Sequence, residues 1–197
     1  MLNLPPIPHH PGQALEAVDT TVKNDLVKHD PDDLIRLFNA TFAESTNTVL
    51  LRGEDEPLYL PADEQDPRNR IYFAHGFFAS ALHEIAHWTL AGARRRRLED
   101  YGYWYQPDGR NAAEQAEFER VERRPQAVEW ALAIACDHPF RVSLDNLGGA
   151  PTDPDAFRAK VHAELTRMHY NGFPPRAERF RQVLCQAWGV TWRLPSG

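Results

Sequence analysis

The chain has 197 residues, of which 42% are hydrophobic and 25% are charged, and its formal net charge is −6. This length and composition are typical of a single globular domain with a substantial core. The acidic balance gives no electrostatic reason to expect binding to nucleic acid or to a membrane. The sequence has two cysteines, no signal-like opening and no apolar run of membrane-spanning length, so we predict a cytoplasmic protein.

Residues 1–29 are predicted to form an N-terminal extension, partly disordered or with a short helix, because four prolines occupy the first eleven positions. The domain is predicted to span residues 30–197. It opens with a helix over residues 31–43, for which Asp30 is a suitable N-cap and Pro31 a suitable first residue. Segments rich in β-branched, aromatic and leucine residues then predict three strands, at residues 48–52, 57–61 and 70–74.

The segment 77–91 is predicted to be a buried central helix, because it is apolar almost all round. It carries His83 and His87, which are four residues apart and can therefore reach one cation from the same helix face. Glu84 lies between them and could act on a metal-bound water. Two core histidines bonded to the backbone are the alternative interpretation, but buried ionisable groups need partners, and a metal ion would supply them.

Two clusters follow this helix. Residues 94–97 are four consecutive arginines, which either complement the C-terminus of the helix or form a docking surface for an acidic partner. The aromatic segment 101–105 is predicted to be a short strand, followed by a turn at 107–109. These aromatic side chains either cover the core or form the wall of a pocket beside the metal.

A polar stripe marks the next part of the chain. We predict a short helix over residues 111–119 and a second over 121–136, with Pro125 in the first turn of the second. Glu122, Gln126 and Glu129 recur at helical spacing on an otherwise apolar stretch. Glu122 is the better candidate for a third metal ligand, and Glu129 is the alternative.

Further elements complete an α+β prediction. A loop with a possible strand at residues 140–142 leads to helices over 153–170 and 176–188. The order of helix, strands and helices predicts a single α+β domain, with a small mixed sheet packed against helices and the motif helix at its centre.

Two chemistries fit two imidazoles and one carboxylate, because such a ligand set leaves coordination positions open. With zinc, bound water is acidified and Glu84 serves as general base, which gives a metallopeptidase or another hydrolase. With Fe(II), the open positions admit dioxygen and substrate, which gives an oxygenase. A third possibility is a non-catalytic protein in which the metal stabilises the core.

Several stretches, in order along residues 32–186, resemble the bacterial elongation factor P hydroxylase family. The longest is NRIYFAHGFFASALHEIAHW at residues 69–88. The others lie at residues 54–63, 102–110, 118–127 and 139–146. The resemblance implies that residues 30–197 form a metal-dependent hydroxylase domain with non-haem Fe(II) as cofactor and dioxygen as cosubstrate. It also implies hydroxylation of the β-lysylated lysine of translation elongation factor P, the final step of that protein's modification.

The resemblance also implies roles for particular residues. The metal ligands would be His83 and His87, with Glu122 as the carboxylate, and Glu84 would orient a ligand or move protons. Ammonium groups of a lysyl substrate could be attracted by acidic side chains, and its methylene groups could be enclosed by aromatic rings. The candidate substrate-binding residues are Tyr103, Tyr105, Asp108 and Glu129. Elongation factor P is the expected partner, and neither nucleic acid nor a membrane is expected.

Overall fold

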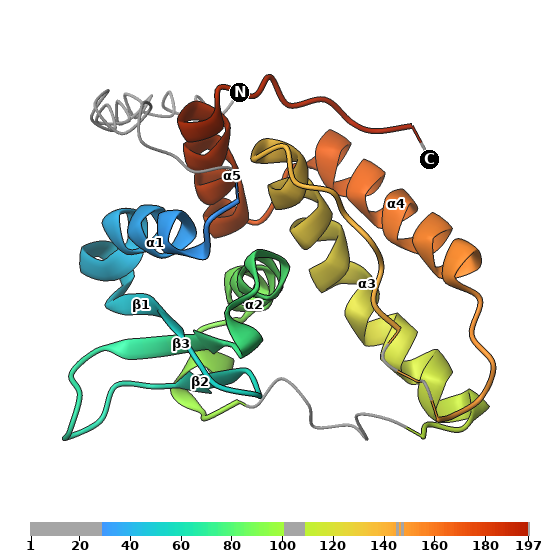
Figure 1. Cartoon of the computed structure of the whole chain (residues 1–197), viewed down its shortest axis with the longest axis horizontal. Coiled ribbons are helices and arrows are strands. Elements are labelled where there is room, and N and C mark those ends of the chain that lie inside the picture. The colour runs from blue at the N-terminus through green and yellow to red at the C-terminus, as the bar shows by residue number, and fades with distance from the viewer. Residues whose placement is uncertain (1–28, 101–108, 145, 147, 197) are drawn as a thin grey trace, which may run out of the picture.

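The computed structural model describes residues 29–100, 109–144, 146 and 148–196. Within these ranges the chain forms five α-helices, three strands and two short 3₁₀ turns (Figure 1). The helices are α1 (Pro31–Thr46), α2 (Phe78–Leu90), α3 (Ala112–Ala135), α4 (Pro154–Asn171) and α5 (Pro175–Trp188). The strands are β1 (Thr48–Arg52), β2 (Leu58–Leu60) and β3 (Asn69–Phe73), and the 3₁₀ turns are η2 (Ala74–Gly76) and η3 (Arg95–Arg97).

The three strands form one small mixed sheet in the order β1-β3-β2. The central strand β3 runs parallel to β1, with Thr48 opposite Asn69, and antiparallel to β2, with Leu58 opposite Tyr72. The chain leaves β3 through η2 and enters α2 directly. As a result α2 lies in the middle of the molecule, between the sheet on one side and α3 and α5 on the other (Figure 1). The α+β prediction is confirmed.

Helix α2 is central because nearly every side of it is covered. Its buried side chains include Leu82 and Ile85, which are at most 1% exposed. The Trp88 ring makes edge contacts with Phe38 and Phe42 of α1, and Phe38 also contacts Phe180 of α5. These aromatic contacts join α1, α2 and α5 into one core, which holds the motif helix in place.

The two cysteines differ in burial. Cys136 is fully buried, whereas Cys185 is half-buried, and both thiols are free. Among the described residues no helix is long and apolar enough to cross a bilayer.

The prediction of two helices between residues 111 and 136 was wrong, because α3 is continuous over 24 residues. Asn111 begins it with a capping box, in which its side chain accepts from the Glu114 amide and Glu114 accepts from the Asn111 amide. The residues that follow are mostly alanine, glutamate and arginine, which favour helix. Pro125 therefore lies inside the helix, where it has no amide hydrogen to donate to the carbonyl of Val121.

Other predicted boundaries differ less. Helix α1 continues to Thr46, three residues further than predicted, and β2 is confined to Leu58–Leu60. Residues 140–142 form no strand. The predictions for residues 1–28 and for the aromatic segment 101–105 lie outside the described residues.

Arg110 ties the start of α3 to the loop that follows it. Its guanidinium is fully buried, and it donates to the Gln115 side chain at 2.9 Å and to the Leu144 carbonyl at 2.6 Å. The guanidinium also lies 3.9 Å from the centre of the Phe118 ring. The amide of Arg110 donates to Asn146. Because Arg110 and Asn146 belong to two of the stretches that carry the family resemblance, the structure explains why these stretches occur together.

We expect Arg110→Met to lower the free energy of unfolding by on the order of 2–5 kcal/mol, since it would leave two buried acceptors without donors. Urea-induced unfolding in the presence of a chelator measures this loss. Arg120→Met is the matched control, because Arg120 pairs with Glu117 at the surface of α3. Equal stability of the two variants would contradict the anchoring role.

Candidate metal centre

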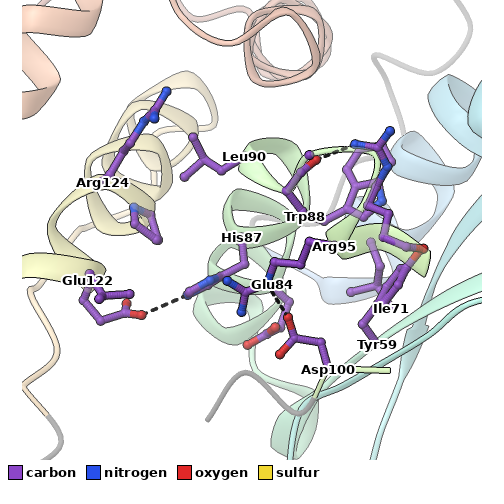
Figure 2. Close-up of a pocket in the computed structure, with 15 residues that line it drawn as sticks. Tyr59, Ile71, Glu84, His87, Trp88, Leu90, Arg95, Asp100, Glu122 and Arg124 are labelled. Atoms are coloured by element: carbon purple, nitrogen blue, oxygen red, sulfur yellow. Dashed lines mark hydrogen bonds and ion pairs between the residues drawn. The ribbon is translucent and has the colours of Figure 1, made fainter. Parts of the chain in front are cut away.

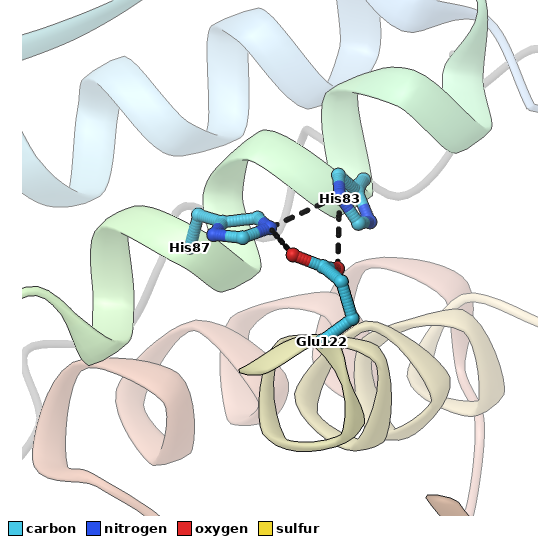
Figure 3. A group of neighbouring side chains, drawn as sticks. All are labelled: His83, His87 and Glu122. Atoms are coloured by element: carbon cyan, nitrogen blue, oxygen red, sulfur yellow. Dashed lines mark hydrogen bonds and ion pairs between the residues drawn. The ribbon is translucent and has the colours of Figure 1, made fainter. Parts of the chain in front are cut away.

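Helix α2 presents His83 and His87 on one face, toward α3 (Figure 3). Their Nε2 atoms lie 3.1 Å apart, although the residues are four positions apart in sequence. This is the arrangement that the helical spacing predicts, because one turn brings both imidazoles to the same side. Both side chains are partly exposed, at 27% for His83 and 23% for His87, so the pair can be reached from outside the core.

The third member of the cluster comes from α3. Glu122 is 2% exposed, and its Oε1 lies 3.3 Å from His87 Nε2 while its Oε2 lies 3.7 Å from His83 Nε2 (Figure 3). One atom from each of His83, His87 and Glu122 lies within 4.8 Å of the others, and these are the residues that could hold a metal ion.

The distances fit a shared cation. Two ligand atoms that are each about 2.0–2.1 Å from one ion lie roughly 2.8–3.4 Å apart when the ligand angles are those of octahedral or tetrahedral coordination. The separations of 3.1 Å between the imidazoles and 3.3 Å between His87 and Glu122 fall in that window, and the 3.7 Å between His83 and Glu122 lies just above it. Two imidazole nitrogens and a carboxylate oxygen suit zinc and ferrous iron alike.

Glu129 holds the far side of the His83 ring. The Nδ1 atom of His83 lies 2.8 Å from Glu129 Oε2, so Nδ1–H donates to this carboxylate and Nε2 faces the cluster. Metal-binding histidines commonly donate their second ring nitrogen in this way, which fixes the tautomer and the ring orientation. The polar stripe of α3 is therefore divided between two tasks, with Glu122 in the cluster and Glu129 behind it.

Gln126, between these two acids, has a different partner. Its side chain donates to the Ser143 carbonyl at 2.8 Å and accepts from the Ser143 amide at 3.0 Å. Gln126 thus fixes the loop after α3 and takes no part in the cluster. The sequence pattern placed all three residues on one face but could not distinguish these partners.

The electrostatic environment of His83 is strongly acidic. Burial alone would lower the pKa of this imidazole, but the charge and hydrogen bond of Glu129, together with the charges of Glu122 and Glu84, raise its pKa from 6.5 to about 10. In the metal-free protein a proton therefore remains on His83 at neutral pH. A cation that binds at Nε2 takes the place of this proton.

Glu84 lies beside the cluster without belonging to it. Burial raises the pKa of its carboxyl group, the charges of His83 and His87 oppose this shift, and the charges of Glu122 and Asp100 add to it. A carboxyl group with a raised pKa can hold or release a proton closer to neutral pH than an ordinary glutamate can.

A cavity of about 260 Å³ adjoins the cluster, and Glu84, His87 and Glu122 form part of its wall (Figure 2). Its apolar and aromatic lining comes from Tyr59, Ile71, Trp88, Leu90, Val121 and Pro125. Charged side chains complete the lining: Arg95, Arg96, Asp100 and Arg124. The cavity gives a substrate a route to the cluster that is apolar along part of its wall.

Sequence reasoning missed Asp100 and Tyr59 as parts of this cavity. Asp100 accepts from Arg95 Nε at 2.7 Å, and its backbone pairs with that of Tyr59. Tyr59 lies in a predicted strand and in a stretch that resembles the family, but neither pattern placed it or Asp100 at a cavity, because their meeting depends on how the segment after η3 returns to the sheet. Tyr103, Tyr105 and Asp108, which were predicted to bind substrate, lie outside the described residues.

The C-terminus of α2 is neutralised by two arginines. Arg96 donates to the Ala91 carbonyl, and Arg176 of α5 donates to the carbonyls of Thr89 at 3.0 Å and Ala91 at 2.5 Å. Cations at this position satisfy carbonyls that have no partner within the helix. One of the four arginines at 94–97 therefore has the role of complementing the helix end, as predicted.

An α+β domain in which a buried carboxylate and two imidazoles converge beside a cavity has the arrangement expected of a metal-dependent enzyme, because the cluster opens onto space for a substrate. Comparison with known proteins identifies the family. Residues 37–195 match the elongation factor P hydroxylase family. The elongation factor P lysine hydroxylase of Haemophilus influenzae is 50% identical over 158 residues, which cover 80% of this chain and 89% of the relative.

The chain belongs to the elongation factor P hydroxylase family, as the sequence motifs indicated, and it is a hydroxylase. The metallopeptidase alternative receives no support from these comparisons.

Metal affinity is expected to rise with pH. The raised pKa of His83 means that its proton is lost from the metal-free protein only as the pH approaches about 10, so a metal must displace it at neutral pH. We expect release of about one proton per ion, and an affinity that rises roughly tenfold per unit between about pH 6.5 and 8.5. Anaerobic calorimetry in two buffers of different ionisation enthalpy counts the protons. A pH-independent affinity would contradict the assignment.

Removal of the Glu129 carboxylate should weaken metal binding although Glu129 is not in the cluster. We expect Glu129→Ala to lower the affinity about 10- to 100-fold, and Glu129→Gln to lower it less, because an amide oxygen can still accept from His83 Nδ1–H. Competition with a chromophoric chelator measures the affinity. Glu117→Ala, at an exposed position of the same helix, is the control. Wild-type affinity in Glu129→Ala would show that the hydrogen bond is dispensable.

Proposed function

We propose that this chain hydroxylates the β-lysylated lysine of translation elongation factor P at an Fe(II) centre held by His83, His87 and Glu122. In this role it performs the final step of that protein's modification. The observation that carries the proposal is the convergence of two imidazoles and a buried carboxylate beside a cavity, in a member of a hydroxylase family.

Iron is proposed because of the reaction that the family name implies. Ferrous iron with open coordination positions supplies the reactivity toward dioxygen that an unactivated side-chain carbon requires, which no amino-acid side chain provides alone. Two imidazoles and one carboxylate leave such positions open. Zinc fits the same ligands but would supply water activation, which hydroxylation with dioxygen does not use.

The chain's own residues orient the centre and handle protons. Glu129 fixes the His83 ring so that Nε2 faces the cluster. Glu84 lies in the cavity wall, and its raised pKa suits it to take up or return a proton there. Because hydroxylation needs no water nucleophile, we assign Glu84 to proton movement or to orienting a ligand, rather than to the general-base role it would have in a hydrolase.

The cavity suits a lysyl chain. Its apolar and aromatic wall, which includes Ile71, Trp88 and Leu90, can cover methylene groups and exclude water. The carboxyl groups of Glu84 and Asp100 can attract ammonium groups. Tyr103, Tyr105 and Asp108 remain candidates for the same tasks. For Glu129 we favour support of His83 over substrate contact, because it is absent from the cavity wall.

We expect Glu122→Ala to lose both metal and hydroxylation, because it removes a ligand that is 2% exposed and leaves two imidazoles alone. Mass spectrometry of elongation factor P after reaction measures the gain of one oxygen atom, and metal analysis follows the ion. Glu117→Ala removes an exposed carboxylate five residues before Glu122 on α3 and should keep both the metal and the hydroxylation. Full iron content and full hydroxylation in Glu122→Ala would exclude Glu122 as a ligand.

A further inference from the structure

Arginines lie on two sides of the cavity. Arg95 and Arg96 of η3 and Arg124 of α3 line the cavity, and Arg95 and Arg124 lie on opposite sides of His87 (Figure 2). Each group is extended by exposed neighbours in sequence, Arg94 and Arg97 on the first side and Arg123 on the second. We call these six residues the arginine rim: Arg94, Arg95, Arg96, Arg97, Arg123 and Arg124.

The fold accounts for two members of the rim. Arg95 bonds to Asp100 at 2.7 Å, and Arg96 caps the end of α2 through the Ala91 carbonyl. Within the described ranges, the other four guanidinium groups form no ion pair and no hydrogen bond. Arg94, Arg97 and Arg123 are also absent from the cavity wall. No hydrogen bond or ion pair in the described ranges therefore accounts for their charge.

Three acids on α3 and α4 near Arg123 and Arg124 have other cations as partners. On α3, Glu117 pairs with Arg120, and Glu119 pairs with Lys160 of α4 at 2.8 Å. Glu164 of α4 is close enough for Arg123 and Arg124 to help lower its pKa, but hydrogen bonds from Arg167 at 2.7 and 2.9 Å are the main cause of that shift. The rim thus stays positive in a chain whose net charge is −6.

An exposed apolar side chain lies beside the arginines. Leu98 follows η3 directly and is 60% exposed, which is high for a leucine in the described part of the chain. Arginine guanidinium groups bind carboxylates through paired hydrogen bonds, and interfaces between proteins combine arginine with apolar contacts. Basic charge next to an exposed leucine suits an acidic protein surface.

We propose that the arginine rim docks an acidic surface of the protein substrate around its modified lysine, while the lysyl chain enters the cavity. This inference rests on the proposed function, which supplies a protein substrate. Positive charge on both sides of the cavity would raise the rate of encounter and orient the substrate so that its lysine points between the two groups. The rim acts on recognition of the folded substrate, and the metal centre acts on the chemistry.

Charge reversal on each side tests this proposal. We expect Arg94→Glu/Arg97→Glu to raise the KM for elongation factor P on the order of tenfold, and Arg123→Glu to raise it several-fold, while kcat at saturating substrate falls far less. The salt dependence of kcat/KM should become shallower in each variant. Fluorescence anisotropy of labelled elongation factor P measures docking separately from hydroxylation.

The controls change charge by the same amount at exposed arginines outside the rim. Arg68→Glu/Arg193→Glu matches the double variant, and Arg193→Glu matches the single one. Both should bind and hydroxylate as the wild type does. Equal KM values and equal anisotropy in the rim variants and the controls would overturn the proposal. Rim-dependent binding of a mixed-sequence single-stranded RNA, without rim-dependent binding of elongation factor P, would also overturn it.

These measurements distinguish failure of docking at the rim from failure of the proposed hydroxylation. If the wild type hydroxylates elongation factor P and the rim variants do so with unchanged KM, docking at the rim fails and the proposed function stands. If the wild type binds elongation factor P through the rim but adds no oxygen atom, the proposed function fails and docking stands.

Discussion

The structure depends on bringing two imidazoles and a buried carboxylate to within 3.1–3.7 Å of each other between α2 and α3. Without a counter-ion such a group is costly, because Glu122 is almost completely removed from water and both Nε2 atoms point inward. The shift of the His83 pKa to about 10 expresses the same demand, since the site binds a proton tightly in the absence of another cation. A divalent metal satisfies the demand more fully.

The rest of the fold fixes the crossing of these two helices. Trp88 and the phenylalanines of α1 and α5 hold α2 at the centre, so its two histidines cannot rotate away from α3. On α3, Glu129 fixes the His83 imidazole from behind, and Gln126 fixes the loop that follows the helix. Glu84 remains at the cavity, where its carboxyl group can exchange protons. One face of α3 thus supplies a candidate metal ligand, Glu122, and the support of another candidate, His83.

Local sequence patterns predicted the parts of the site that depend on helical spacing. His83 and His87 are one turn apart, and Glu122 and Glu129 recur on one face of α3, so their positions on the elements followed from the sequence alone. The Glu129–His83 bond joins residues 46 positions apart, and no local pattern contains it. The same is true of Asp100 and Tyr59. Pro125 was the reason for the wrong prediction of two helices in place of α3, because helix-forming residues and a capping box outweigh one interior proline.

The most direct measurement is anomalous diffraction at the iron edge from crystals of the protein grown anaerobically with Fe(II). We expect one iron peak between α2 and α3, about 2.0–2.2 Å from His83 Nε2, His87 Nε2 and a Glu122 oxygen, with Glu129 still bonded to His83 Nδ1. An iron ion coordinated by Glu129 in place of Glu122, or bound away from the two histidines, would contradict it.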